Sequence, residues 1–127
     1  MARAPRTSAE TEVEAVIVAA SAIDTGADVV IATDTSGTIL YWNALAERLF
    51  GWPVADVLSR NIVDVVVSQQ TAEQSADIMR AVLAGKTWTG SFLVRTRDGS
   101  PKILKVTDTP VFVDGRVAGI VGVSQPV

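Results

Sequence analysis

The stretch that decides the fold is residues 34–52, which read DTSGTILYWNALAERLFGW. A Thr-Ser-Gly turn separates two runs rich in β-branched and aromatic residues, 28–34 and 38–42, and this pattern predicts a β-hairpin. Asn43, a preferred N-cap, then precedes apolar residues at helical spacing, and Gly51 follows where helices commonly end. These residues predict a hairpin joined directly to a short amphipathic helix.

Upstream of the hairpin, residues 8–23 have the pattern of an amphipathic helix, and Thr7 with Glu10 has the spacing of a capping box. We therefore divide the chain into a tail and helix at 1–24 and a domain at 25–127. The apolar stripe of the helix has two readings. It packs on the chain's own domain, or it forms a two-fold contact in a homodimer, because nearby alanines permit close helix approach. The stripe consists of Val13, Val16, Ile17 and Ala20.

Downstream, a helical turn is predicted at 54–58, an apolar segment of open type at 62–67, and a longer helix between Thr71 and Gly85. After Gly85 the period of the pattern changes to two. Asp-Gly turns then separate three strands, which we expect at 88–97, 102–109 and 117–123.

This order of elements predicts an α+β domain with a five-stranded antiparallel sheet. If the first hairpin pairs with the last strand, the strand order is 2-1-5-4-3 and the short helices cover one face. The other face needs a cover, and the flanking N-terminal helix is the spare element.

Composition excludes several classes of function. The chain has 127 residues, of which 48% are hydrophobic and 20% charged, typical of one globular domain. It has no cysteine and no histidine, which excludes disulfides, thiol nucleophiles, Ser-His-Asp triads and the usual zinc sites. A net charge of −3 argues against nucleic-acid binding, and we expect no enzymatic activity. No apolar run has membrane-spanning length, so we expect a soluble, cytoplasmic chain.

The chain resembles a PAS domain over residues 25 to about 124. The resemblance rests on the D-x-x-G hairpin from Asp34, the Asn43 cap and the Phe50-Gly51 helix end, followed by the Gly90-Ser-Phe and Asp114-Gly-Arg-Val segments. It implies a sensory or dimerisation module that holds a small molecule, or nothing, between its helices and its sheet. Such modules transmit a change through flanking helices to a separate output domain. Because the chain ends just after the last strand, we expect a sensor taken from a larger signalling protein. We expect it to be a homodimer through the apolar stripe of the N-terminal helix.

Departures from the family pattern limit the cofactor. Ile62 stands where light-oxygen-voltage members of the family have the cysteine that forms a flavin adduct, so that photochemistry is excluded. Ser124 stands where the same members offer a glutamine to the flavin, which leaves only a noncovalent flavin redox sensor as an alternative. Haem is disfavoured because no histidine exists and Met79 would be the sole ligand.

We expect the inward face of the domain to be apolar. Such a lining suits a core filled by side chains, our first expectation, or an apolar metabolite such as an acyl chain or aromatic ring. A ligand-free protein-interaction module is the corresponding alternative function. The residues assigned to the inward face are Ile31, Leu49, Ile62, Val66, Ile78, Met79, Val82, Phe92, Val94, Leu104, Val106 and Val121, with Val123 as an additional candidate.

Three polar residues are candidates for the pocket: Asn43, Asp108 and Ser124. Asn43 is better explained as a helix cap. Asp108 has the same parity along its strand as Leu104 and Val106, and an inward carboxylate would be a functional candidate. We expect instead that a β-bulge near Pro110 turns it outward.

Overall fold

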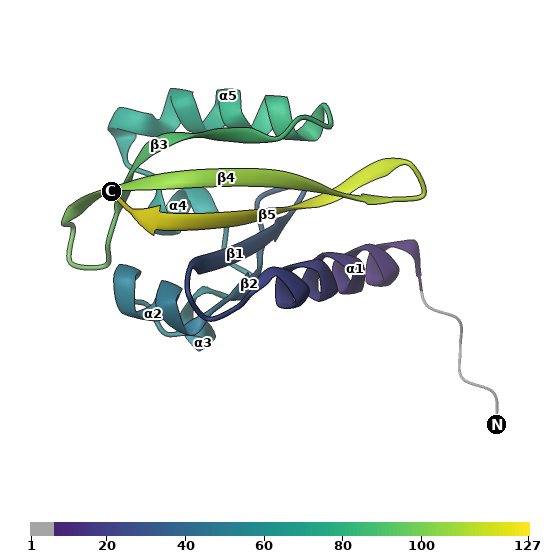
Figure 1. Cartoon of the computed structure of the whole chain (residues 1–127), viewed down its shortest axis with the longest axis horizontal. Coiled ribbons are helices and arrows are strands. Elements are labelled where there is room, and N and C mark those ends of the chain that lie inside the picture. Colours follow the sequence, from purple (N-terminus) through teal and green to yellow (C-terminus); the bar gives the residue numbers. More distant parts are fainter. Residues whose placement is uncertain (1–6) are drawn as a thin grey trace.

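The computed structural model describes residues 7–127. The helices and strands follow the predicted order (Figure 1). They are α1 (Ser8–Ile23), β1 (Val29–Asp34), β2 (Ile39–Trp42), α2 (Ala44–Phe50), α3 (Val54–Val57), α4 (Ile62–Val66), a 3₁₀ turn (Gln69–Thr71), α5 (Ala72–Leu83), β3 (Trp88–Arg95), β4 (Pro101–Val113) and β5 (Arg116–Pro126). Within residues 7–127, no helix is long and apolar enough to cross a membrane.

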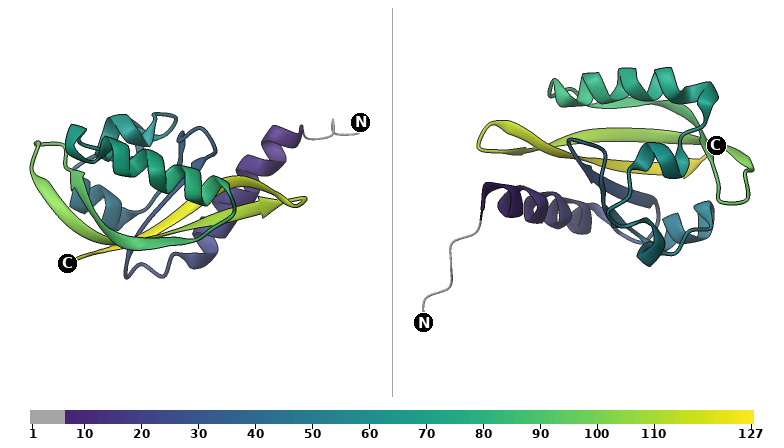
Figure 2. Two further views of the ribbon diagram at one scale, coloured as in Figure 1. Left: turned by 90° about the horizontal axis from the view of Figure 1, so that it is seen from above. Right: turned by 180° about the vertical axis from the view of Figure 1, so that it is seen from behind.

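The five strands form one antiparallel sheet in the order β2-β1-β5-β4-β3, which confirms the predicted fold. α1 lies along β1 and β5 on one face, whereas α4 and α5 lie on the other (Figures 1 and 2). The sheet is therefore covered on both sides, and its central strand is β5, which lies between β1 and β4.

Local hydrogen bonds explain where the elements begin. The Thr7 side chain accepts a hydrogen bond from the Glu10 amide at 3.1 Å, and the predicted cap of α1 is confirmed. At the start of α2, the Asn43 side chain accepts a hydrogen bond from the Ala46 amide at 3.0 Å. Gly51 ends α2 with a φ of 80°, a left-handed conformation that favours glycine.

α1 packs on its own sheet through the residues that we had assigned to one apolar stripe. Val16 and Ala20 are fully buried against β1 and β5. A Cβ at Gly119 of β5 would lie 2.6 Å from a Val16 methyl group and 2.4 Å from the Thr33 carbonyl oxygen, so glycine is required for this close approach. The stripe is thus divided, and its assignment as a single dimer surface is wrong for Val16 and Ala20.

Candidate ligand cavity

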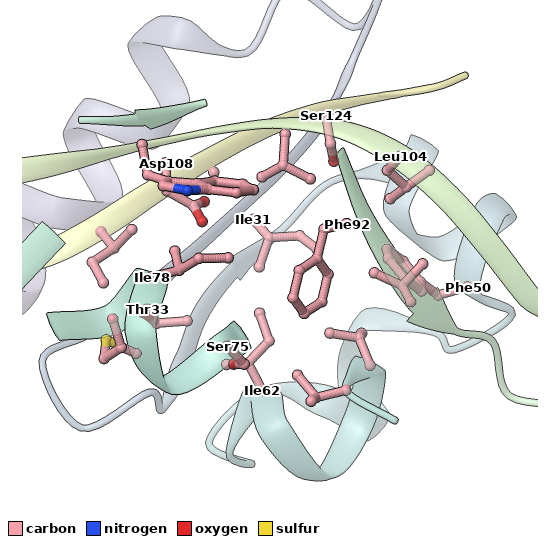
Figure 3. Close-up of a pocket in the computed structure, with 18 residues that line it drawn as sticks. Ile31, Thr33, Phe50, Ile62, Ser75, Ile78, Phe92, Leu104, Asp108 and Ser124 are labelled. Atoms are coloured by element: carbon pink, nitrogen blue, oxygen red, sulfur yellow. The ribbon is translucent and has the colours of Figure 1, made fainter. Parts of the chain in front are cut away.

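A cavity of about 130 Å³ lies between the inner face of the sheet and the helices α4 and α5 (Figure 3). The interior is therefore not completely filled by side chains, contrary to our first expectation. Its lining is Ile31, Thr33, Phe50, Ile62, Val66, Val67, Ser75, Ile78, Met79, Trp88, Phe92, Val94, Leu104, Val106, Asp108, Ile120, Gly122 and Ser124.

Most of the residues that we assigned to the inward face do line this cavity. They come from β1, α4, α5, β3 and β4. They are Ile31, Ile62, Val66, Ile78, Met79, Phe92, Val94, Leu104 and Val106.

Three of the twelve assigned residues, and the additional candidate Val123, lie elsewhere. Val121 and the additional candidate Val123 pack in the cluster beneath α1, on the opposite face of the sheet. Leu49 is half-buried at the side of the inner core, and Val82 is fully buried in α5 without reaching the cavity. We predicted the wrong face of the sheet for these β5 side chains. Glycines and apolar residues occupy both faces of β5, so its sequence has no alternation of apolar and polar residues.

Several lining residues were missed. Trp88 shares the strand parity of Phe92 and Val94, so the alternation along the strand could have found it. Ile120 and Gly122 could be found only from the register of β5 against β1, which pairs Gly122 with Ile31. The remaining missed residues are Thr33, Phe50, Val67 and Ser75.

Asn43 does not reach the cavity. Besides capping α2, its side-chain amide donates hydrogen bonds to the Asp28 carbonyl at 2.8 Å and to Asp24 Oδ1 at 3.1 Å. Asp24 Oδ2 also accepts a hydrogen bond from the Tyr41 hydroxyl at 2.7 Å, and this bond holds the pKa of Asp24 below its usual value. Since Asp24 is the C-cap of α1, these contacts tie the end of α1 to β2 and to the start of α2.

Asp108 faces the cavity, contrary to our expectation of a bulge near Pro110. The register pairs Asp108 with Trp88 on one side and with Gly122 on the other. The irregularity in β4 falls between Val111 and Phe112, too far along the strand to turn Asp108 outward. Figure 3 shows the carboxyl group directed from the sheet into the space beside Ile31 and Ile78.

Gly122 makes room for this carboxyl group. A Cβ at position 122 would lie 2.6 Å from Asp108 Oδ1, closer than such atoms approach in proteins. A side chain there would therefore displace the carboxylate. The missing Cβ in the central strand β5 lets the carboxyl group lie over the sheet inside the cavity.

The electrostatic environment of Asp108 is unfavourable for its charged form. Burial raises the pKa of the carboxyl group to about 6, because the surrounding apolar side chains replace water. Within residues 7–127, no group donates a hydrogen bond to this carboxyl group, and it is the sole ionisable side chain among those lining the cavity. The remaining polar side chains of the lining are the hydroxyls of Thr33, Ser75 and Ser124.

The domain is thus a five-stranded antiparallel sheet with helices around an apolar cavity on one face and a further helix packed on the other. The family model described as PAS fold matches residues 19–127. The chain therefore belongs to the PAS family, as the sequence resemblance predicted.

Solved structures share this fold. A PAS domain from Colwellia psychrerythraea has a TM-score of 0.75 and 22% identity, over 87% of this chain and 95% of that one. The Rhodobacter sphaeroides LOV protein has a TM-score of 0.75 and 15% identity, over 92% and 68% of the two chains. The PAS-B domain of Drosophila melanogaster Cycle, solved with bound ethylene glycol, has a TM-score of 0.70 and 12% identity, over 78% and 99%. No curated protein sequence matches the chain.

Proposed function

We propose that this PAS domain is the sensory module of a larger signalling protein and that it binds a small, mainly apolar molecule in its internal cavity. The cavity carries the proposal. Protein interiors rarely contain voids much larger than a water molecule, whereas this one measures about 130 Å³. An apolar cavity of about 150 Å³ can bind a benzene molecule. The expected guest is therefore the size of a single ring or a short branched chain.

The cavity does not fit a flavin. The flavin ring system has three fused rings, and a space close to that of one benzene ring cannot enclose it. Ile62 and Ser124, which replace the cysteine and glutamine of the flavin-binding members, both line the cavity. A flavin redox sensor is thus not the function that this lining supports.

Two strands separate the cavity from α1 and offer a route for the signal. On the inner side, Ile31 and Gly122 line the cavity. On the outer side, Val30 and Val121 belong to the cluster in which α1 is packed. A guest that shifts β1 or β5 therefore shifts the surface on which α1 rests, and the pose of α1 reports whether the cavity is occupied.

Native mass spectrometry of the freshly purified domain and a benzene titration test this proposal together. We expect either a small mass that is lost on denaturation, or benzene-dependent shifts of the amide resonances around the cavity. Val106→Trp should abolish these shifts by filling the cavity, with the folded spectrum otherwise retained. Ile103→Trp is the matched control, because Ile103 lies on the same strand but is 55% exposed. If no molecule co-purifies and benzene produces no shift in the wild type, the proposal is wrong.

A second candidate function is self-association through the free side of α1. Val13 and Ile17 line a shallow hollow together with Ala9, Glu10 and Glu14. We propose that a second copy of this chain occupies this hollow. The proposal keeps the predicted dimer contact only for the residues of the stripe that are not buried. Ile17→Glu should then convert a dimer to a monomer in sedimentation. A wild type that sediments as a monomer at all concentrations would refute this candidate.

A further inference from the structure

We infer that the guest of this cavity is a small amine, whose ammonium group pairs with the Asp108 carboxylate while its apolar body fills the space beneath α4 and α5. This inference rests on the proposed function, because it names the class of molecule that the cavity would take. It is carried by the position of Asp108, the absence of a partner for its carboxyl group in residues 7–127, and the lining around it.

The Asp108 carboxylate has the position expected of a ligand-binding group. It projects from the sheet into the cavity (Figure 3). Its Oδ1 atom occupies the space that a Cβ at Gly122 would need. A structural role would give its oxygens donors from the protein, as Asp34 has from the Ser36 and Thr38 amides at 2.9 Å. Asp108 has none among the described residues, and a partly buried carboxylate without a partner is costly.

The chemistry of the lining specifies the sign of the guest's charge. No lysine or arginine is among the lining residues, so the ionised carboxylate leaves an uncompensated negative charge in an apolar space. An ammonium group supplies both the opposite charge and hydrogen-bond donors, and charge-assisted hydrogen bonds are about twice as strong as neutral ones. An anionic guest would meet repulsion, and a purely apolar guest would leave the charge buried and unpaired.

Neighbouring side chains complete an amine site. Trp88 lies directly opposite Asp108 in the sheet register and lines the same cavity, as does Phe92, and aromatic rings attract cations. Ser124, two residues from Gly122 on the same face of β5, carries a hydroxyl that can accept a further N–H. The remaining lining is apolar and suits a hydrocarbon body of about six non-hydrogen atoms, by the benzene comparison.

The test compares two probes of equal shape, cyclopentylamine and cyclopentanol, by amide chemical shifts at pH 7.5 on the purified domain. We expect the amine to bind about tenfold or more tightly than the alcohol, the preference that one charge-assisted bond provides. Asp108→Asn should remove the preference while keeping the shape of the side chain. Asp114→Asn is the matched control, since it removes the same charge from an exposed turn and should leave the preference unchanged.

A second measurement needs no substitution. Lowering the pH through about 6 should weaken amine binding to the wild type and leave alcohol binding unchanged. Among the described residues that line the cavity, Asp108 is the one with an ionisable side chain, so its protonation is what this change of pH would alter there. Equal affinities for the two probes, or an amine preference that survives both Asp108→Asn and acid, would overturn the inference while the proposed function stands. If neither probe binds the wild type, both fail.

Discussion

The buried Asp108 carboxylate makes the stability of the ligand-free domain depend on pH in an unusual direction. Its pKa is about 6 in the folded domain, against 3.8 as the ordinary value. Between these two values the folded state holds a proton that the unfolded state has released. The free energy of unfolding therefore falls as the pH rises from 4 to 6, and the loss attributable to Asp108 is complete above that range.

The magnitude follows from the size of the pKa difference. A separation of about two units, at about 1.4 kcal/mol for each unit, corresponds to roughly 3 kcal/mol of stability lost at neutral pH. That is a large share of the 5 to 15 kcal/mol that is typical of a domain. Asp108→Asn removes the ionisation. Because part of the loss has already occurred at pH 4, the substituted domain should gain about 2 to 3 kcal/mol of stability relative to wild type between pH 4 and pH 7.5.

Urea unfolding of both proteins at several pH values, monitored by circular dichroism, measures this difference. Other carboxylates act in the opposite direction. Asp98, for example, has a pKa lowered to about 2, chiefly by a hydrogen bond from Thr96, and Asp24 is lowered as well. The difference between Asp108→Asn and wild type cancels their contributions, because both proteins contain them. A difference that stays constant from pH 4 to pH 7.5 would refute the assignment of a buried, unpaired carboxylate.

Two further predictions concern α1. Val16→Glu should destabilise the domain by more than about 3 kcal/mol, because it places a charge in the fully buried contact between α1 and the sheet, whereas Ile17→Glu on the exposed side should change the urea midpoint little. A Val16→Glu midpoint equal to that of Ile17→Glu would contradict the packing. Tyr41→Phe should cost about 1 kcal/mol at pH 7 through the lost hydrogen bond to Asp24. This cost should shrink in acid as the Asp24 carboxylate is protonated, and an undiminished cost would argue against the bond.

Local chemistry was sufficient for much of the fold. The Thr7 and Asn43 caps, the glycine that ends α2 and the two Asp-Gly turns depend on residues within a few positions of one another. The inward parity of β3 and β4 could also be read, because each strand alternates clearly between apolar and polar positions. The PAS family followed from the order and spacing of these same features.

The sequence did not reveal which way β5 faces or where the cavity lies. The segment around Gly119 and Gly122 is apolar or side-chain-free on both faces, since α1 covers one side and the cavity lies on the other. Only its hydrogen-bonded register against β1 and β4 assigns Gly122 to the cavity and Val121 to α1. The sequence also could not divide the apolar stripe on α1 into a buried and an exposed part, because that division depends on which strands α1 packs against.

The direction of the Asp108 side chain shows most clearly why the sequence alone did not settle the site. Strand parity placed its side chain inward, and a bulge expected one or two residues later would have reversed it. The deciding facts were the position of the irregularity beyond Val111 and the gap left by a glycine on the neighbouring strand. The sequence by itself determined most of the elements, the caps of α1 and α2 and the family, because these depend on neighbours along the chain. The tertiary structure decided the cavity and its one carboxylate, because empty space and unpaired charge depend on which distant residues are brought together.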